Sequence, residues 1–153
     1  MFTLIRPISA LVMAIIGLIA AQFYTQLYAG EAAQLGRFHL WLAALAAVIG
    51  YGFLGTRVAR GPGWAVYFTL QAVVLTALLA AATFALRMVF IFGQRRIYRE
   101  PVDAVEGFFD HMLRFLAIGL NPGFLLFLAG ASLATGIGLH LVFRLLERRR
   151  LAR

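Results

Sequence analysis

Several kinds of residue are missing or scarce in this chain, and each absence excludes a class of function. Cysteine is absent, which excludes disulfide bonds, thiolate metal ligands and cysteine nucleophiles. Lysine is absent too, so all 14 basic residues are arginine, and a lysine-bearing phosphate loop of the P-loop type is excluded. No acidic residue lies inside a long apolar stretch of the sequence, which argues against a proton-coupled transporter.

Charged residues as a whole are few. They make up 13% of the 153 residues, whereas hydrophobic residues make up 63%, and the mean hydropathy is +0.89. Soluble domains average about 45–50% apolar and about 25% charged residues. A soluble fold of this length cannot hide so much apolar surface from water. The composition therefore predicts an integral membrane protein, with residues 1–153 forming a single membrane domain.

Four apolar stretches are long enough to cross a bilayer, which takes about 20 residues of helix. They are residues 7–28, 38–55, 64–86 and 115–143, and 92 is an alternative end of the third stretch. Because they are apolar all round, we expect an all-α fold in the form of a membrane-embedded four-helix bundle. The first stretch also has the length of a signal peptide. It ends in Phe23, Tyr24 and Tyr28 without a cleavage site of small residues, so we expect it to be retained as a span.

The arginine residues lie mostly at the ends of these stretches. If the N-terminus is cytoplasmic, eight of them fall on the cytoplasmic side and six on the outer side. Basic residues favour the cytoplasmic side, so we expect both termini to be cytoplasmic. The formal net charge of +8 does not indicate nucleic-acid binding, because the arginines do not form a soluble basic face. Lipid phosphates are their expected partners.

Residues 101–114 have the pattern of an amphipathic helix. Pro101 suits the first turn of a helix, and Asp103 and Glu106 suit the positive end of its dipole. Apolar residues recur at three- and four-residue spacing, namely Val102, Val105, Phe108, Phe109, Met112, Leu113 and Leu116. We expect an interfacial helix on the outer surface before the last span. The alternative is an N-terminal extension of the last helix, and the bend-forming residues 121–123 favour a separate helix.

Three histidines raise the question of a haem or metal site. In the expected topology His39 lies near the outer side and His140 near the inner side, so about 20 Å of helix separates their depths. His111 lies in the interfacial helix, and no pair has metal-ligand spacing on one helix. We therefore expect no cofactor and no metal. The sequence also lacks a catalytic triad, paired catalytic carboxylates and a hydride-carrier motif, so the expected function is not enzymatic.

The turn between the second and third spans is short, basic and rich in glycine. Its backbone N–H groups, together with Arg57, Arg60 and Gly61, are suited to hold an oxyanion or a lipid phosphate. A second basic cluster contains Arg95 and Arg96, shortly after the third span. The simpler interpretation of the turn is a tight connection whose arginines fix the topology of the chain.

Few polar side chains lie inside the predicted spans. Gln71, Asn121, Ser132 and Thr135 fit either a substrate path or hydrogen bonds between helices, and the second is the more common role. Arg87 lies at the end of the third span, where a long side chain reaches the interface. We expect it to be an anchor.

The two basic segments resemble those of a known family. Residues 55–57 (Gly-Thr-Arg) with 60–61 (Arg-Gly), and 95–98 (Arg-Arg-Ile-Tyr) followed by 101–105 (Pro-Val-Asp-Ala-Val), are similar to the TrgA family of tellurite-resistance membrane proteins. The size, the basic tail and the four-span hydropathy are similar too, although Arg-Glu at 99–100 replaces an acidic residue and a glycine. The resemblance implies an alphaproteobacterial protein of the bacterial inner membrane, associated with tellurite tolerance, and it brings no catalytic residues.

The sequence leaves three functions open. The leading one is a non-enzymatic contribution to tellurite or oxyanion tolerance, with the four matching arginines as candidate residues. The second is an accessory or assembly subunit of a larger inner-membrane complex, respiratory or photosynthetic. The third is a small transporter, which requires a polar path along Gln71, Thr76 and Thr83. Membrane lipids are expected partners in each case, and a homo-oligomer or a larger membrane complex is left open.

Overall fold

Every regular element of the described chain is a helix. The computed structural model describes residues 4–28, 37–57, 61–94 and 100–151. In chain order the elements are α1 (Ile5–Leu27), α3 (Phe38–Ile49), the π-helical turn η1 (Gly50–Leu54), α4 (Pro62–Gln94), α5 (Pro101–Gly119) and α6 (Pro122–Leu151). The predicted all-α class is therefore confirmed for the described residues.

Three of the helices, α1, α4 and α6, are long and apolar enough to cross a membrane. A shorter apolar helix, Phe38–Leu54, is formed by α3 and η1 together. The outward surfaces of these helices are apolar as well, with Leu11 63%, Val48 68% and Leu126 74% exposed. Lipid chains, unlike water, solvate exposed apolar surface on this scale favourably. The helices are thus consistent with a membrane protein.

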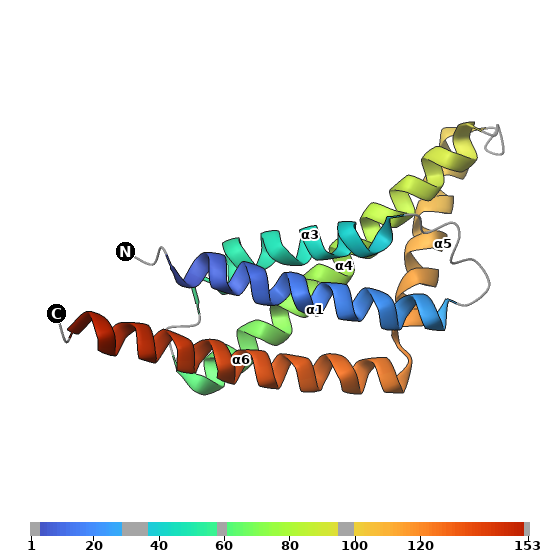
Figure 1. The fold of residues 1–153 in the computed structure, drawn as a ribbon. Coiled ribbons are helices and arrows are strands. Elements are labelled where there is room, and N and C mark those ends of the chain that lie inside the picture. Colours follow the sequence, from blue (N-terminus) through green and yellow to red (C-terminus); the bar gives the residue numbers. More distant parts are fainter. Residues whose placement is uncertain (1–3, 29–36, 58–60, 95–99, 152–153) are drawn as a thin grey trace.

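The helix assembly has two distinct ends (Figure 1). Helices α1, α3 and α6 lie along one another, and α4 crosses them obliquely. The start of α1 and the end of α6 lie together at what we call the terminal end. Helix α5 lies across the opposite end, which we call the α5 end. Helix α4 has 33 residues and is therefore about 50 Å long.

Small residues bring α1 close to α3. A Cβ atom added to Gly17 would lie 3.0 Å from the Cβ of Ala46. The Ser9 hydroxyl, which is fully buried, lies 2.8 Å from the carbonyl oxygen of Gly50. Close backbone approach of this kind is typical of helix pairs in membranes, where packing rather than hydrophobic burial drives association.

The π-helical turn η1 explains how two glycines face α1 together. The backbone N–H of Gly55 donates to the carbonyl of Gly50 at 2.9 Å, so residues five apart lie one above the other. A Cβ added to Gly50 would lie 2.7 Å from the carbonyl oxygen of Ser9, and one added to Gly55 would lie 2.9 Å from the Cα of Arg6. Regular α-helical geometry would turn one of these glycines away from α1.

Helices α4 and α6 are joined by a similar contact. A Cβ added to Gly136 of α6 would lie 2.6 Å from the Cα and 2.8 Å from the backbone nitrogen of Val66 in α4. The hydroxyls of Ser132 and Thr69, which are both buried, donate to carbonyls of their own helices at 2.7 Å. The helices therefore pack through small or internally satisfied residues.

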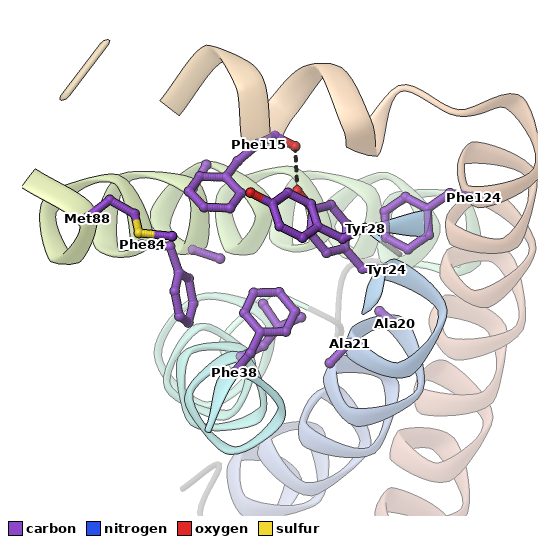
Figure 2. Close-up of a cluster of buried hydrophobic side chains, with 12 residues drawn as sticks. Ala20, Ala21, Tyr24, Tyr28, Phe38, Phe84, Met88, Phe115 and Phe124 are labelled. Carbon is purple, nitrogen blue, oxygen red and sulfur yellow. Dashed lines mark hydrogen bonds between the residues drawn. The ribbon is translucent and has the colours of Figure 1, made fainter. Parts of the chain in front are cut away.

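Aromatic side chains from five helices meet near the α5 end (Figure 2). The buried members of this cluster are Tyr24 and Tyr28 of α1, Phe38 of α3, Phe84 of α4, Phe115 of α5 and Phe124 of α6. The rings of Phe38 and Phe84 are 4.7 Å apart, and those of Tyr28 and Phe115 are 5.8 Å apart. This cluster fixes the position of α5 against the other helices.

Helix α5 is a separate helix, as the sequence predicts. It begins with a capping box, in which the backbone N–H of Glu100 donates to the Asp103 carboxylate at 3.2 Å. After it ends, the side-chain oxygen of Asn121 accepts a hydrogen bond from the backbone N–H of Gly123 at 3.0 Å. Asn121 thus caps α6, and Pro122 occupies the first turn of α6, where it needs no N–H partner.

Several helix ends differ from the expected span ends. Helix α4 continues to Gln94, beyond both expected ends at 86 and 92, and there the ring of Phe92 stacks on His111 of α5 with 5.2 Å between centroids. Helix α5 continues to Gly119 rather than 114, and α6 begins at Pro122 rather than 115. Residues 115–119 were expected in the last span because they are apolar, but the break between the two helices lies at Leu120 and Asn121, so these residues belong to α5.

The surface of α5 has three faces. One face packs on the other helices through Phe108, His111, Met112 and Phe115. The second face is exposed and apolar and consists of Val102, Val105, Phe109 and Leu113. The third face is exposed and charged and consists of Asp103, Glu106, Asp110 and Arg114. The apolar stripe of the sequence is therefore divided between packing and an exposed apolar face.

Candidate anion site at the Arg57 turn

The turn that follows η1 lies at the terminal end of the molecule. The backbone N–H of Arg57 donates to the carbonyl of Leu54 at 3.0 Å. The hydroxyl of Thr56 donates to the carbonyl of Phe53 at 3.0 Å. These two bonds close the turn, so the backbone of Arg57 is held before its side chain makes any contact.

The side chain of Arg57 lies on two aromatic rings. Its guanidinium carbon is 4.1 Å from the ring centroid of Phe53 and 5.8 Å from that of Phe68, distances at which a cation is attracted to the ring face. One N–H group, on Nη1, donates weakly to the carbonyl of Phe53 at 3.4 Å. A guanidinium has several more donors, and no acceptor for them lies among the described residues. Arg57 is therefore oriented but still able to bind an anion.

The aromatic wall beside Arg57 continues along the first turns of α4. The ring of Trp64 stacks on Phe68 at 5.7 Å and meets Tyr67 edge-on at 5.8 Å. Trp64 and Tyr67 are 56% and 50% exposed. Exposed tryptophan and tyrosine rings at a helix end are typical of the level of lipid headgroups. The surroundings of Arg57 thus suit a phosphate-bearing partner.

Gly61 sets the direction in which the chain enters α4. Its φ is 143°, a value that residues with a side chain rarely adopt. Its carbonyl accepts the backbone N–H of Ala65 at 2.9 Å, which is the first hydrogen bond of α4. A Cβ added here would meet nothing within 4 Å, so the backbone conformation alone requires glycine.

Arg6 also contacts this turn, which the sequence did not reveal. Its guanidinium lies 6.0 Å from the ring of Tyr51, and its Cα borders Gly55. The Nε atom of Arg6 is buried and has no hydrogen-bond acceptor among the described residues. Residues 6 and 55 are brought together by the packing of α1 on η1, so no local pattern could predict this proximity.

Of the five residues predicted to form an anion site, two are described. Arg57 and Gly61 belong to the same turn, whereas Arg60, Arg95 and Arg96 lie outside the described residues. The last described residue before the second cluster, Gln94, ends α4 about 50 Å of helix away from Pro62. Of the two predicted basic clusters, the structure therefore describes only part of the turn at the terminal end, which Arg6 borders.

Charged residues are distributed unequally between the two ends. Among the described residues, the terminal end carries the exposed Arg144 and Arg148 and the half-buried Arg6 and Arg57, with Glu147 as its acidic residue. The α5 end carries Arg37, Arg87 and Arg114 together with the acidic residues Glu100, Asp103, Glu106 and Asp110. The described charges are therefore more positive at the terminal end, which favours an anion there.

The three histidines lie apart from one another. His39 is in the first turn of α3, His111 stacks on Phe92, and His140 is buried in α6 near the terminal end. Among the described residues, no group of three or more metal-ligating side chains comes together.

The three polar residues of α4 that a polar path would need are hydrogen-bonded within α4. The side-chain amide of Gln71 donates to the hydroxyl of Tyr67 at 2.9 Å. The hydroxyls of Thr76 and Thr83 donate to carbonyls four residues earlier at 2.7 Å. These three residues therefore present no continuous row of free donors, which a path for a polar substrate requires.

Comparisons with family models, with curated proteins and with solved structures give no match to this chain.

Proposed function

We propose that the chain crosses the bacterial inner membrane four times, as a four-helix bundle with both termini in the cytoplasm. The apolar core of a bilayer is about 30 Å thick. Helices α1, α4 and α6 exceed this length. Helix α3 with 12 residues and η1 with 5 together measure about 26 Å, a length that a slightly thinned bilayer accommodates. The basic terminal end supports the cytoplasmic assignment.

In this topology α5 lies at the outer surface as an interfacial helix. Its exposed apolar face meets the lipid, and its acidic face meets water. The two faces are adjacent on the helix, which is the arrangement that supports a helix lying in the interface plane.

The function that we propose is a non-enzymatic contribution to tolerance of tellurite or a related oxyanion, through anion binding at the Arg57 turn. A single observation carries this proposal: the guanidinium of Arg57 is held on the Phe53 ring at 4.1 Å while most of its donors are uncommitted within the described chain. Guanidinium groups bind tetrahedral and related oxyanions through paired N–H donors. The resemblance of this turn to the TrgA family supports tellurite as the relevant anion.

The experiment compares tellurite tolerance in cells that express different variants at equal membrane levels. We expect Arg57→Ala to lower tolerance to that of cells without the protein, and Arg57→Lys to restore it only in part, because lysine cannot donate as a planar fork. Arg148→Ala is the matched control, since it removes one exposed positive charge at the same end. Full tolerance with Arg57→Ala would refute the proposal. Binding of tellurite, compared with inorganic phosphate, to purified protein then separates an oxyanion ligand from a lipid headgroup.

A second function, an accessory subunit of a larger membrane complex, is supported by one surface of α6. Gly130 and Gly138 have no atom within 4 Å of an added Cβ, and Ala134 between them is exposed. Three small residues at four-residue spacing form a face on which another membrane helix packs closely. A stoichiometric partner that co-purifies in mild detergent, and is lost with Ala134→Leu, would favour this function over independent action.

A further inference from the structure

An apolar cavity lies among the helices, with α1 and α4 forming its longest walls. It has a volume of about 100 Å³. The wall on α1 runs from Met13 to Tyr24 and the wall on α4 from Val73 to Phe84, so each covers about three helical turns, or about 16 Å. Residues of α3, α5 and α6 complete the lining, namely Phe38, Leu42, Ala46, Phe115, Leu116, Phe124 and Leu128. We call this cavity the α1–α4 slot.

Small side chains create this slot. Helix α1 lines it with Ala20, and α4 lines it with Ala77, Ala80 and Ala81. Gly17 also lines it, but this glycine packs closely on Ala46 of α3. Small residues that face each other usually allow two membrane helices to approach closely. Helices α1 and α4 remain apart, however, because each packs on α3 and α6 instead. The facing small residues thus leave space that the protein itself does not fill.

The slot is open on one side. Ala77 lies on the same face of α4 as Val73, Ala80 and Phe84, which are buried. Ala77 itself is exposed. Leu70 and Val74, which precede it on the adjacent part of α4, are exposed as well, so the slot opens where the buried face of α4 meets its exposed face. At the α5 end the slot is lined by Tyr24, Phe84, Phe115 and Phe124 of the aromatic cluster, which Figure 2 labels.

The polar side chains that line the slot donate their hydrogen bonds within the protein and not to a bound molecule. The hydroxyl of Thr76 donates to the carbonyl of Ala72 at 2.7 Å. The hydroxyl of Tyr24 donates to the carbonyl of Phe115 at 2.9 Å. The other residues that line the slot are apolar. Apolar cavities of comparable volume stay free of water and accept apolar guests. Because the volume is only about 100 Å³ while the walls on α1 and α4 each extend about 16 Å, a segment of a thin, flexible hydrocarbon chain fits better than a compact guest.

We propose that the α1–α4 slot holds an acyl chain of a bilayer phospholipid, which enters over Ala77. The bound chain supplies the van der Waals contacts that the facing small residues of α1 and α4 do not supply to each other. This inference rests on the proposed membrane crossing of α1 and α4. It does not depend on anion binding at Arg57.

The test uses the full-length chain in vesicles of phosphatidylethanolamine and phosphatidylglycerol. A fraction of the phosphatidylglycerol carries a photoreactive diazirine midway along one acyl chain. After irradiation, we expect adducts on the slot residues Thr76 and Ala80 as well as on the outward residues Leu78 and Leu126. Adducts confined to the outward residues would overturn the slot proposal. Absence of adducts on the outward residues as well would instead refute the membrane crossing on which it rests.

The second arm of the experiment uses variants in which a larger side chain at position 77 fills the slot. We expect Ala77→Phe to reduce labelling of Thr76 and Ala80 to background, with labelling of Leu126 unchanged. Ala44→Phe is the matched control, because Ala44 is exposed on α3 outside the slot, and it should label like the original chain. Ala77→Leu provides a smaller filling residue if phenylalanine impairs folding. Undiminished labelling of Thr76 in a folded Ala77→Leu or Ala77→Phe protein would overturn the proposal.

Discussion

The hydroxyl of Tyr24 donates a hydrogen bond to the carbonyl oxygen of Phe115 at 2.9 Å, and this bond joins α1 to α5 (Figure 2). Both side chains are buried, at 7% and 6% exposed. Helix α5 is otherwise attached mainly to the C-terminal part of α4. The bond therefore connects α5 to α1 through two residues that also line the α1–α4 slot.

Removal of this bond should weaken the attachment of α5. We expect Tyr24→Phe to lower the free energy of unfolding by about 0.5–1.5 kcal/mol, the usual contribution of one hydrogen bond. Unfolding of the purified protein in detergent measures the loss, and hydrogen exchange should show faster opening of α5. Tyr67→Phe is the control, because the hydroxyl of Tyr67 is in an exposed side chain and bonds only locally to Gln71. Equal losses for the two variants would contradict a special role for the bond to Phe115.

The contact between α4 and α6 should not tolerate a methyl group at Gly136. An added Cβ would lie 2.6 Å from the Cα of Val66, which is backbone and cannot rotate away. We expect Gly136→Ala to lower the free energy of unfolding by about 1–3 kcal/mol, the usual cost of overpacking. Gly138→Ala meets nothing within 4 Å, so it should be neutral or stabilise the helix slightly. A neutral Gly136→Ala variant would mean that α4 and α6 are not in close contact.

Substitutions at two nearby glycines distinguish the cost of backbone strain from the cost of steric contact. Neither Gly61 nor Gly63 would place an added Cβ within 4 Å of another atom, but Gly61 has a φ of 143°. We expect Gly61→Ala to cost about 1–3 kcal/mol of stability from backbone strain. Gly63→Ala should cost nothing and is expected to reduce the entropy of the unfolded chain. Thermal unfolding of the two variants side by side tests the conformation of the turn, and identical melting temperatures would contradict it.

The cap of α6 gives a fourth prediction. The side chain of Asn121 accepts the backbone N–H of Gly123 at 3.0 Å. Asn121→Ala should cost about 0.5–2 kcal/mol, whereas Asn121→Asp retains the acceptor and should be close to neutral. Hydrogen exchange at the amide of Gly123 reports the cap directly. If that amide exchanges equally fast in all three proteins, α5 and α6 are not separated by this cap.

Features with local causes could be predicted from the sequence. The start of α5 follows from Pro101 and Asp103, which act within the first turn, and its end was indicated by Asn121 and Pro122. The long apolar helices follow from hydropathy alone. The exact ends of α4 and α5 could not be predicted, because they depend on contacts between the two helices, such as that of Phe92 with His111.

Features that depend on contacts between distant parts of the chain could not be predicted from the sequence. Sequence alone gives no reason for the π-helical turn η1, because it places Gly50 and Gly55 against a helix far away in the chain. For the same reason the sequence did not indicate that Arg6 borders the Arg57 turn. The sequence did indicate Arg57 and Gly61 as candidate site residues. It could not indicate the contact of Arg57 with Phe68, which depends on how α4 returns beside η1.

The measurement that tests the central claim most directly is the labelling of single cysteines with a membrane-impermeant maleimide in intact spheroplasts. The chain has no cysteine of its own, so each introduced thiol reports one position. Thr56→Cys, Glu106→Cys and Arg148→Cys replace exposed residues at the Arg57 turn, on α5 and near the end of α6. The four-crossing topology predicts labelling of Glu106→Cys alone, with the other two labelled only after the membrane is permeabilised. Labelling of Thr56→Cys and Glu106→Cys from the same side would show that α4 does not cross, and the account would be wrong.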